Sequence, residues 1–342
     1  MKLHTWFRQL LLLPAAFLLA GCYAKSAPLP ALSSDLVVYT CLDTDISEPV
    51  IREFQERTDR IIEVKTGTVQ ELERLLQNNR ISETCDVVFG ISADALNQYR
   101  EFWMPYQSPC ADALSSEFHD PAYLWTGFSA VPSVILYNTR VVTYREVPTD
   151  WNSLLEPRWK GRIAMADPTV SPASAAALTS AANASDDPKR YLTQLAENLD
   201  GMIFTEQEQV LKAISDGVCS VGICPESKAE QLRRQNLDID YIYPADGTCL
   251  LPNGTAIVSG CAHPEAAAEF LDFTIRTDTQ RILLSHMNQR SVRRDLPLPA
   301  GLPAADLLPL ADMDYERFSV LQSRTLDTWN LLFTSPRGGD GT

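Results

Sequence analysis

Residues 162–184 read RIAMADPTVSPASAAALTSAANA, which joins a short apolar run to a long alanine-rich one. The first run, residues 163–166, is typical of a buried strand, and the second is typical of a helix. Between them lie the hydroxyl residues Thr169, Ser171 and Ser174. The first turn of a helix carries N–H groups without intrahelical partners and a partial positive charge, which together bind anions. The stretch therefore predicts an anion site, although each hydroxyl could instead only cap the helix.

Strands and helices alternate on both sides of this stretch. We expect strands at 36–40, 61–65, 85–90, 131–137, 162–166, 202–204, 218–223 and 239–243, and helices at 46–57, 68–80, 206–216, 225–235 and 312–333, with another from about residue 93. This alternation predicts an α/β fold with mostly parallel sheets covered by helices on both faces. In such sheets, ligands bind beyond the carboxyl ends of the strands. Because the strands fall into two series, we expect two lobes with a cleft between them.

Most of the other candidate binding residues lie in loops or at helix starts that follow an expected strand. These further candidates for ligand binding are Thr40, Asp43, Ser92, Ala93, Thr205, Glu226 and Asn253. The acidic pair Glu206 and Glu208 complicates an anion site, since two carboxylates would repel a dianion. They could instead cap a helix, or receive ammonium or hydroxyl groups of a solute. We therefore expect a small, polar and at least partly anionic solute.

The composition excludes some classes of partner. The chain has 342 residues, with 29 lysines and arginines against 44 aspartates and glutamates, which gives a formal net charge of −15. Such a charge disfavours nucleic acid and anionic lipid surfaces. There is no phosphate-binding Gly-x-x-x-x-Gly-Lys loop and no nucleophile elbow. We therefore expect no enzyme activity, no cofactor and no nucleic-acid partner.

The N-terminus has the pattern of a secretory signal. Lys2 and Arg8 precede an apolar run, residues 10–21, that is too short to span a bilayer. The run ends in Leu-Ala-Gly-Cys at residues 19–22, which resembles the lipobox of bacterial lipoproteins. We expect a signal peptide at 1–21, acylation of Cys22 and an extracytoplasmic protein anchored to the membrane. An ordinary signal peptide with a chance cysteine is the alternative.

Seven cysteines follow Cys22, and none has zinc-site spacing. Outside the cell disulfides can form, but an odd number leaves at least one thiol unpaired within the chain. Two pairings are conceivable, Cys249 with Cys261 and Cys85 with Cys110. Free buried cysteines are an equal alternative.

Several ordered segments together resemble the bacterial family 1 extracellular solute-binding proteins. They include LVVYTCLDTDISEPVIREFQERT (36–58), DVVFGISADAL (86–96), WNSLLEPRWKGRIAMADPTVSPAS (151–174), DGVCSVGICPESKA (216–229) and NQRSVRRDLP (288–297). The resemblance covers roughly residues 35–333. It implies a two-lobed periplasmic-binding-protein fold of type II, and capture of a small solute for the permease subunits of an ATP-binding cassette importer.

Two branches of that family differ in their ligands. The ferric-iron branch uses a Tyr-Tyr pair after the strand equivalent to 218–223, and this chain has no such pair. Tyr241 and Tyr243 are expected to face opposite sides of a strand. The similarity is greater to the branch that binds phosphonates and phosphate esters. A carboxylate-rich metal site using Asp43, Asp45, Glu206 and Glu226 remains an alternative, as does a ligand-sensing co-receptor for a membrane kinase.

The resemblance also implies how the chain divides. We expect lobe 1 at residues 35–130 and 256–292, and lobe 2 at 131–255 and 293–334. A tether at 22–34 and a disordered tail at 335–342 would flank them. The protein is expected to act as a monomer.

Overall fold

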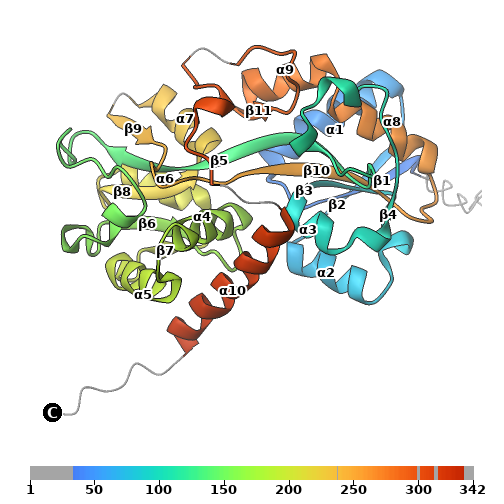
Figure 1. Cartoon of the computed structure of the whole chain (residues 1–342). Helices are drawn as coiled ribbons and strands as arrows, with labels where there is room; N and C mark the ends of the chain where they lie inside the picture. The colour runs from blue at the N-terminus through green and yellow to red at the C-terminus, as the bar shows by residue number, and fades with distance from the viewer. Residues whose placement is uncertain (1–33, 237, 299–300, 312–314, 335–342) are drawn as a thin grey trace, which may run out of the picture. The chain divides into compact units, whose positions relative to one another are not determined.

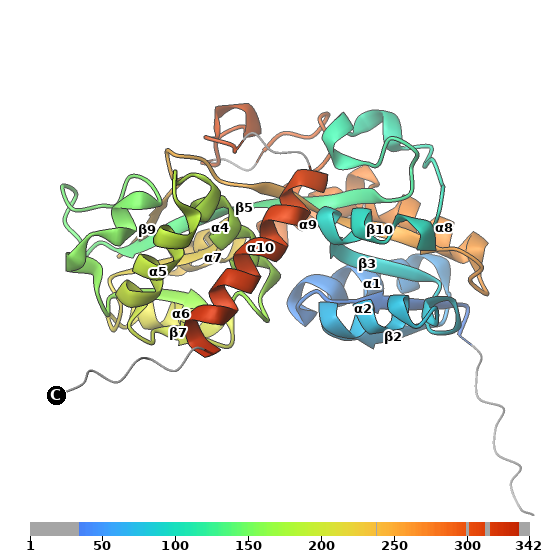
Figure 2. The ribbon, with the colours of Figure 1, turned by 60° about the horizontal axis from the view of Figure 1, so that its bottom comes forward.

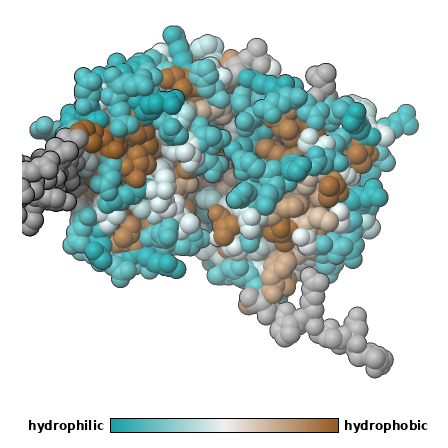
Figure 3. Space-filling model, turned by 180° about the vertical axis from the view of Figure 1, so that it is seen from behind, coloured by the Kyte–Doolittle hydropathy of each residue, from teal (hydrophilic) through white to brown (hydrophobic). Residues whose placement is uncertain are grey.

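The computed structural model describes residues 34–236, 238–298, 301–311 and 315–334 (Figure 1). The expected signal peptide, the expected acylation site Cys22, nearly all of the expected tether and the tail after residue 334 lie outside this part of the chain. None of the helices within these ranges combines the length and the apolar character needed to cross a membrane. Most of the surface in Figure 3 is hydrophilic and is interrupted by separate apolar areas.

A sheet of eleven strands runs through the described residues. Its main path has the order β2-β1-β3-β10-β5-β8-β6-β7, while β4 pairs with β10, and β9 and β11 pair with β5. The strands are β1 (Leu36–Thr40), β2 (Ile62–Thr66), β3 (Val87–Ser92), β4 (Trp103–Met104), β5 (Thr126–Asn138), β6 (Ile163–Ala166), β7 (Ile203–Phe204), β8 (Val221–Pro225), β9 (Ile239–Ile242), β10 (Leu250–Val258) and β11 (Arg290–Ser291).

The sheet divides into two lobes that share two long strands. In lobe 1, β1 is parallel to β2 and β3. In lobe 2, β6 is parallel to β7 and β8. Strand β5 pairs with β10 over residues 126–132 and with β8 and β9 over 133–138, so it passes from one lobe into the other. Figure 1 shows β5 and β10 side by side between the lobes. The expected two-lobed α/β fold is confirmed.

Helices cover the faces of both halves of the sheet. They are α1 (Thr44–Thr58), α2 (Val69–Gln77), α3 (Ala93–Gln98), α4 (Pro172–Asn183), α5 (Pro188–Leu199), α6 (Gln207–Ser215), α7 (Glu226–Gln235), α8 (Pro264–Thr274), α9 (Thr277–His286) and α10 (Tyr315–Thr334). In lobe 1, the ring of Phe54 on α1 lies 5.2 Å from Phe270 and 5.3 Å from Phe273 on α8. In lobe 2, fully buried Trp151 and Leu178 belong to a second core. Each lobe therefore has a hydrophobic core of its own.

Helix α10 contacts both lobes. It packs on α3 of lobe 1 and on α4 and α5 of lobe 2, and Figure 2 shows it running across the space between them. Its side chains Phe318 and Trp329 are buried, and Trp329 joins the core of lobe 2. The helix expected at 312–333 is thus present and packs into the core, and residues 312–314 of the expected range lie outside the described chain.

Two local expectations are wrong, and the structure decides between the alternatives left open for the cysteines. The helix expected at 68–80 ends at Gln77, because Asn79 adopts a left-handed φ of 52°. Strand β9 ends at Ile242, so Tyr243 lies beyond the strand and need not face the side opposite to Tyr241. The two rings lie 5.8 Å apart, on the same side. The seven cysteines after Cys22 are all free, so the two conceivable pairings do not form in this structure.

Candidate functional site

A cavity of about 400 Å³ lies between the lobes, where several strands end and helices begin. Lobe 1 contributes the loop after β1 and the end of β3, and the shared strand β10 adds Leu251 and Asn253. Lobe 2 contributes the start of α4, the loop before α6 and the first turn of α7. This is the place that the strand-end rule predicts for a ligand in an α/β protein.

Five of the ten predicted binding residues line this cavity. They are Asp43, Ser92, Ser171, Thr205 and Asn253. Asp43 is the N-cap residue of α1, and Ser92 holds the same position before α3. Asn253 is the partner of Ser92 in the β3–β10 register, so the two side chains are placed together by strand pairing.

The other five predicted residues do not line the cavity. Thr40 and Ala93 are completely buried, and Ser174 is 1% exposed. Thr169 lines a neighbouring, smaller pocket, where its hydroxyl donates to Asp167 Oδ1 at 2.8 Å. Glu226 is also completely buried, because its carboxylate faces the core rather than the cavity.

The buried Glu226 carboxylate forms a bidentate ion pair. Both of its oxygens accept hydrogen bonds of 2.7 Å from the guanidinium of Arg290 on β11. The hydroxyl of Tyr243 donates to the same carboxylate. Burial and the Glu226 charge both raise the pKa of Tyr243, so its phenol stays protonated. The ion pair therefore ties the start of α7 to the strand crossing.

Lys228, in the first turn of α7, provides the positive charge in the lining of the cavity. Its side chain is only 9% exposed, and its Nζ lies 2.8 Å from Glu208, 3.1 Å from Asp45 and 3.6 Å from Asp43. Burial disfavours the charged amine, but the hydrogen bond to Glu208 and the charge of Asp45 outweigh it and raise the pKa of Lys228. Burial also disfavours the charged form of Asp43, and this raises the pKa of Asp43 despite the opposing effect of Lys228. Lys228 is the only lysine, arginine or histidine among the described residues that line the cavity.

The hydroxyls at the start of α4 are already engaged. Ser171 Oγ accepts the N–H of Ser174 at 3.3 Å, which caps the helix. The amide nitrogen of Gln207 donates to Ser171 Oγ at 3.1 Å and to Ser174 Oγ at 3.0 Å. The amide oxygen of Gln207 has no hydrogen-bond partner within the described chain. Ser171 retains its own O–H hydrogen for an acceptor in the cavity.

The start of α7 lacks such a cap. Its N-cap residue is Pro225, which makes no side-chain cap hydrogen bond to the first turn. The cavity is lined there by Pro225, Ser227 and Lys228. A helix start without a cap, next to a lysine, combines free N–H donors with positive charge. Sequence reasoning missed Lys228, although its position in the first turn after a buried strand was a usable signal.

The alternative of a carboxylate or phenolate metal site receives no support from the geometry. Among the described residues, no group of three or more His, Cys, Asp or Glu side chains could hold a metal ion. The hydroxyl of Tyr241 donates to Glu230 at 3.2 Å, and burial raises its pKa to about 12. Neither Tyr241 nor Tyr243 lines the cavity.

Comparison with known proteins agrees with this architecture. A family model described as "Bacterial extracellular solute-binding protein" matches residues 83–309. The chain is 22% identical over 325 residues to the "Fe(3+)-binding periplasmic protein" of Serratia marcescens, covering 91% of this chain and 92% of the relative.

Two solved structures have the same fold. Iron-bound HitA from Pseudomonas aeruginosa superposes with a TM-score of 0.77 at 18% identity, covering 87% of this chain and 98% of that one. AfuA from Actinobacillus pleuropneumoniae, with fructose-6-phosphate bound, gives a TM-score of 0.76 at 21% identity, covering 86% and 97%. At such identities the likeness establishes the fold, and the site must be argued from this chain.

Proposed function

Because the chain belongs to the family of bacterial extracellular solute-binding proteins, we propose that it captures a small phosphorylated or phosphonylated solute between its lobes. The solute would carry hydroxyl or amine groups as well as its anionic group. Delivery to the permease subunits of an ATP-binding cassette importer would follow closure of the lobes around it.

The observation that carries this proposal is the position of Lys228. It stands at the uncapped start of α7 and faces the cavity between the lobes. An anionic oxygen there would receive donors from the ammonium group and from backbone N–H groups. Ser171 Oγ lines the same cavity and offers a further donor from the start of α4.

The acidic residues define the rest of the solute. Asp43, Glu206 and Glu208 line the cavity together with Lys228, so carboxylates outnumber the cation. A bare dianion would be repelled by them. A solute that also presents hydroxyl or ammonium donors would turn these carboxylates into hydrogen-bond acceptors. AfuA, described with fructose-6-phosphate, shows that this fold accepts a phosphorylated polyol.

Closure is supported by contacts that join the lobes. Lys228 of lobe 2 pairs with Asp45 of lobe 1, and Gln70 Nε2 of lobe 1 donates to the carbonyl of Thr169 at 2.9 Å. A solute that adds contacts to both lobes would shift the population further toward the closed state.

A panel of sugar phosphates, glycerol phosphate, phosphonates and ferric citrate, screened by thermal shift and then by calorimetry, tests the proposal. We expect a phosphorylated polyol to bind, and Lys228→Met to weaken it about tenfold or more, since a hydrogen bond to a charged group is worth roughly 1.5–3 kcal/mol. Lys212→Met is the matched control, because that lysine is exposed and pairs with Asp216, away from the cavity lining. Equal affinity in the Lys228 variant, or binding of ferric citrate alone, would refute the proposal.

We also propose that a lipid on Cys22 anchors the protein to the extracytoplasmic face of the membrane. The support is the Leu-Ala-Gly-Cys sequence at residues 19–22 after an apolar run. Metabolic labelling with a palmitate analogue should mark the wild type and not Cys22→Ser. Labelling of both proteins, or of neither, would contradict the anchor.

A further inference from the structure

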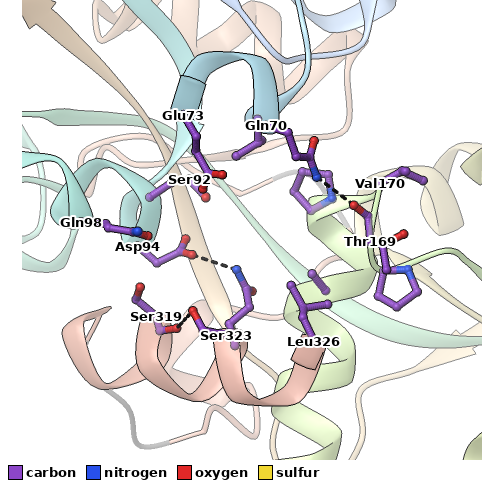
Figure 4. Close-up of a pocket in the computed structure, with 16 residues that line it drawn as sticks. Gln70, Glu73, Ser92, Asp94, Gln98, Thr169, Val170, Ser319, Ser323 and Leu326 are labelled. Carbon is purple, nitrogen blue, oxygen red and sulfur yellow. Dashed lines mark hydrogen bonds between the residues drawn. The ribbon is translucent and has the colours of Figure 1, made fainter. Parts of the chain in front are cut away.

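A second pocket of about 190 Å³ lies beside the main cavity, under helix α10 (Figure 4). It is enclosed by α2 and α3 of lobe 1, by the loop before α4, and by one face of α10. The two spaces share four lining residues, Val69, Ser92, Val170 and Pro172. The side pocket, as we call it, is therefore adjacent to the main cavity and has walls of its own.

Asp94 is the buried polar group of the side pocket. The residue is 4% exposed, and its Oδ2 accepts a hydrogen bond of 3.0 Å from Gln322 Nε2 on α10. Its other oxygen, Oδ1, has no hydrogen-bond partner within the described chain. Figure 4 shows Asp94 linked by a hydrogen bond to a side chain of α10. A buried carboxylate oxygen without a donor is costly and rare in native proteins.

Gln322 adds a second acceptor to the same place. Because its amide nitrogen donates to Asp94, its amide oxygen must point elsewhere, and this Oε1 also lacks a hydrogen-bond partner among the described residues. Both residues line the side pocket. Two acceptors on one wall without donors call for a group that donates at least two hydrogen bonds.

The charge of the lining selects the donor. Glu73 joins Asp94 in the lining, and no lysine, arginine or histidine of the described chain lines the side pocket. Burial raises the pKa of both carboxyls, and for Asp94 it outweighs the opposing effect of hydrogen bonds from Ser92, from Gln322 and from the backbone at residues 94 and 95. Ser319 and Ser323 of α10 complete a polar wall. A bound cation would compensate the negative charge of these two carboxylates.

We propose that the side pocket binds a small primary ammonium group, whose N–H hydrogens bond to Asp94 Oδ1 and Gln322 Oε1. The group could belong to a free small amine or to an amine-bearing end of the solute in the main cavity. The chemistry is the same in both cases. The proposal stands on the side pocket alone and does not require that the main cavity bind a phosphorylated solute.

The first experiment uses methylammonium chloride as the probe, with the full-length protein, followed by NMR of side-chain amides and by thermal shift. Methylammonium should bind in the millimolar range and move the Gln322 side-chain signal. Tetramethylammonium has the same charge and no N–H donor, so it should bind at least about tenfold more weakly. Failure of methylammonium to bind, or equal binding of both ions, would overturn the proposal.

Variants of the lining residues test whether methylammonium binds in the side pocket. Asp94→Asn should weaken methylammonium binding about tenfold or more, and Gln322→Met should weaken it by a smaller factor. Asp59→Asn is the matched control, because Asp59 is an exposed helix-end residue with a left-handed φ of 55° that asparagine tolerates. Should Asp94→Asn fail to fold, Gln322→Met alone decides. Unchanged affinity in the folded pocket variants would refute the site.

A second arm distinguishes the two sources of the ammonium group. If a main-cavity solute supplies it, amine-bearing solutes should lose affinity in Asp94→Asn while solutes without an amine should not. If a free amine supplies it, methylammonium should still bind when the main cavity is saturated with glycerol phosphate. Because methylammonium binding is measured without any phosphorylated compound, this proposal and the proposed function can fail separately.

Discussion

Lys228 Nζ lies 3.1 Å from Asp45 Oδ2, and the two residues belong to opposite lobes. The pair spans 183 positions of sequence and crosses the cavity in which we place the solute. Lys228 is buried, whereas the Asp45 side chain is 56% exposed. The aspartate therefore competes for the lysine with any anion that enters the cavity, and it can be displaced into solvent at small cost.

Removing this competitor should strengthen anion binding. Asp45→Asn is expected to tighten binding of a phosphorylated solute by up to about fivefold, because the Asp45 side chain is exposed and ion pairs at the surface are worth about 0.2–1 kcal/mol. Calorimetry on the best solute of the panel measures the change. Glu48→Gln, on the same helix and paired with the exposed Arg52, should leave the affinity unchanged. Weaker binding in Asp45→Asn would show that Asp45 holds the solute instead of competing with it.

The carboxyl of Asp43 should make stability depend on pH. Burial raises its pKa, so the folded state binds this proton more tightly than the unfolded state does. Ionisation of Asp43 therefore costs stability, and the cost vanishes as pH falls through the raised value toward the ordinary aspartate pKa of about 3.9.

We expect Asp43→Asn to have a higher melting temperature than the wild type at pH 7 and a similar one near pH 4. The gain should be modest, since the side chain is 61% exposed and screened by solvent. Thermal melts of both proteins across this range, with Asp59→Asn as control, measure it. A gain that grows as the pH falls would contradict the sign.

Breaking the buried ion pair of Glu226 and Arg290 should strongly lower the free energy of unfolding. Arg290→Met is expected to lower the free energy of unfolding by about 3–5 kcal/mol, because it leaves a fully buried carboxylate without its partner. Arg276→Met removes an exposed arginine and should change little. Denaturant unfolding gives the values. The double variant Glu226→Gln with Arg290→Met should recover part of the loss, and a double variant as unstable as the single one would argue against an electrostatic cause.

Gly90 should tolerate no side chain. Its φ is +75°, and a Cβ there would lie 2.2 Å from the Leu42 side chain, in the wall of the cavity. Gly260 has nearly the same φ, +72°, with nothing within 4 Å of a Cβ. Gly90→Ala should therefore cost at least about 1 kcal/mol more than Gly260→Ala, the usual penalty of overpacking, and should also weaken solute binding. Equal unfolding free energies would mean that Leu42 moves aside freely.

The sequence pattern was sufficient for the α/β architecture and for the location of the cavity. Ser171 and Asp43 could be anticipated because each follows a buried strand and precedes a helix. The orientation of single side chains could not be anticipated from the sequence. Glu226 and Lys228 are two residues apart on α7, yet one faces the core and the other the cavity. Their partners, Arg290 and Asp45, are distant in sequence, and only the strand crossing brings them near.

Helix α10 has a consequence for how a solute enters. It rests on α3 in one lobe and on α4 and α5 in the other, so the lobes cannot separate on that side without breaking its packing, which includes fully buried Trp329. Opening should therefore be asymmetric. The lobes should stay together on the α10 side, and the solute should enter and leave at the side of the cavity that faces away from α10.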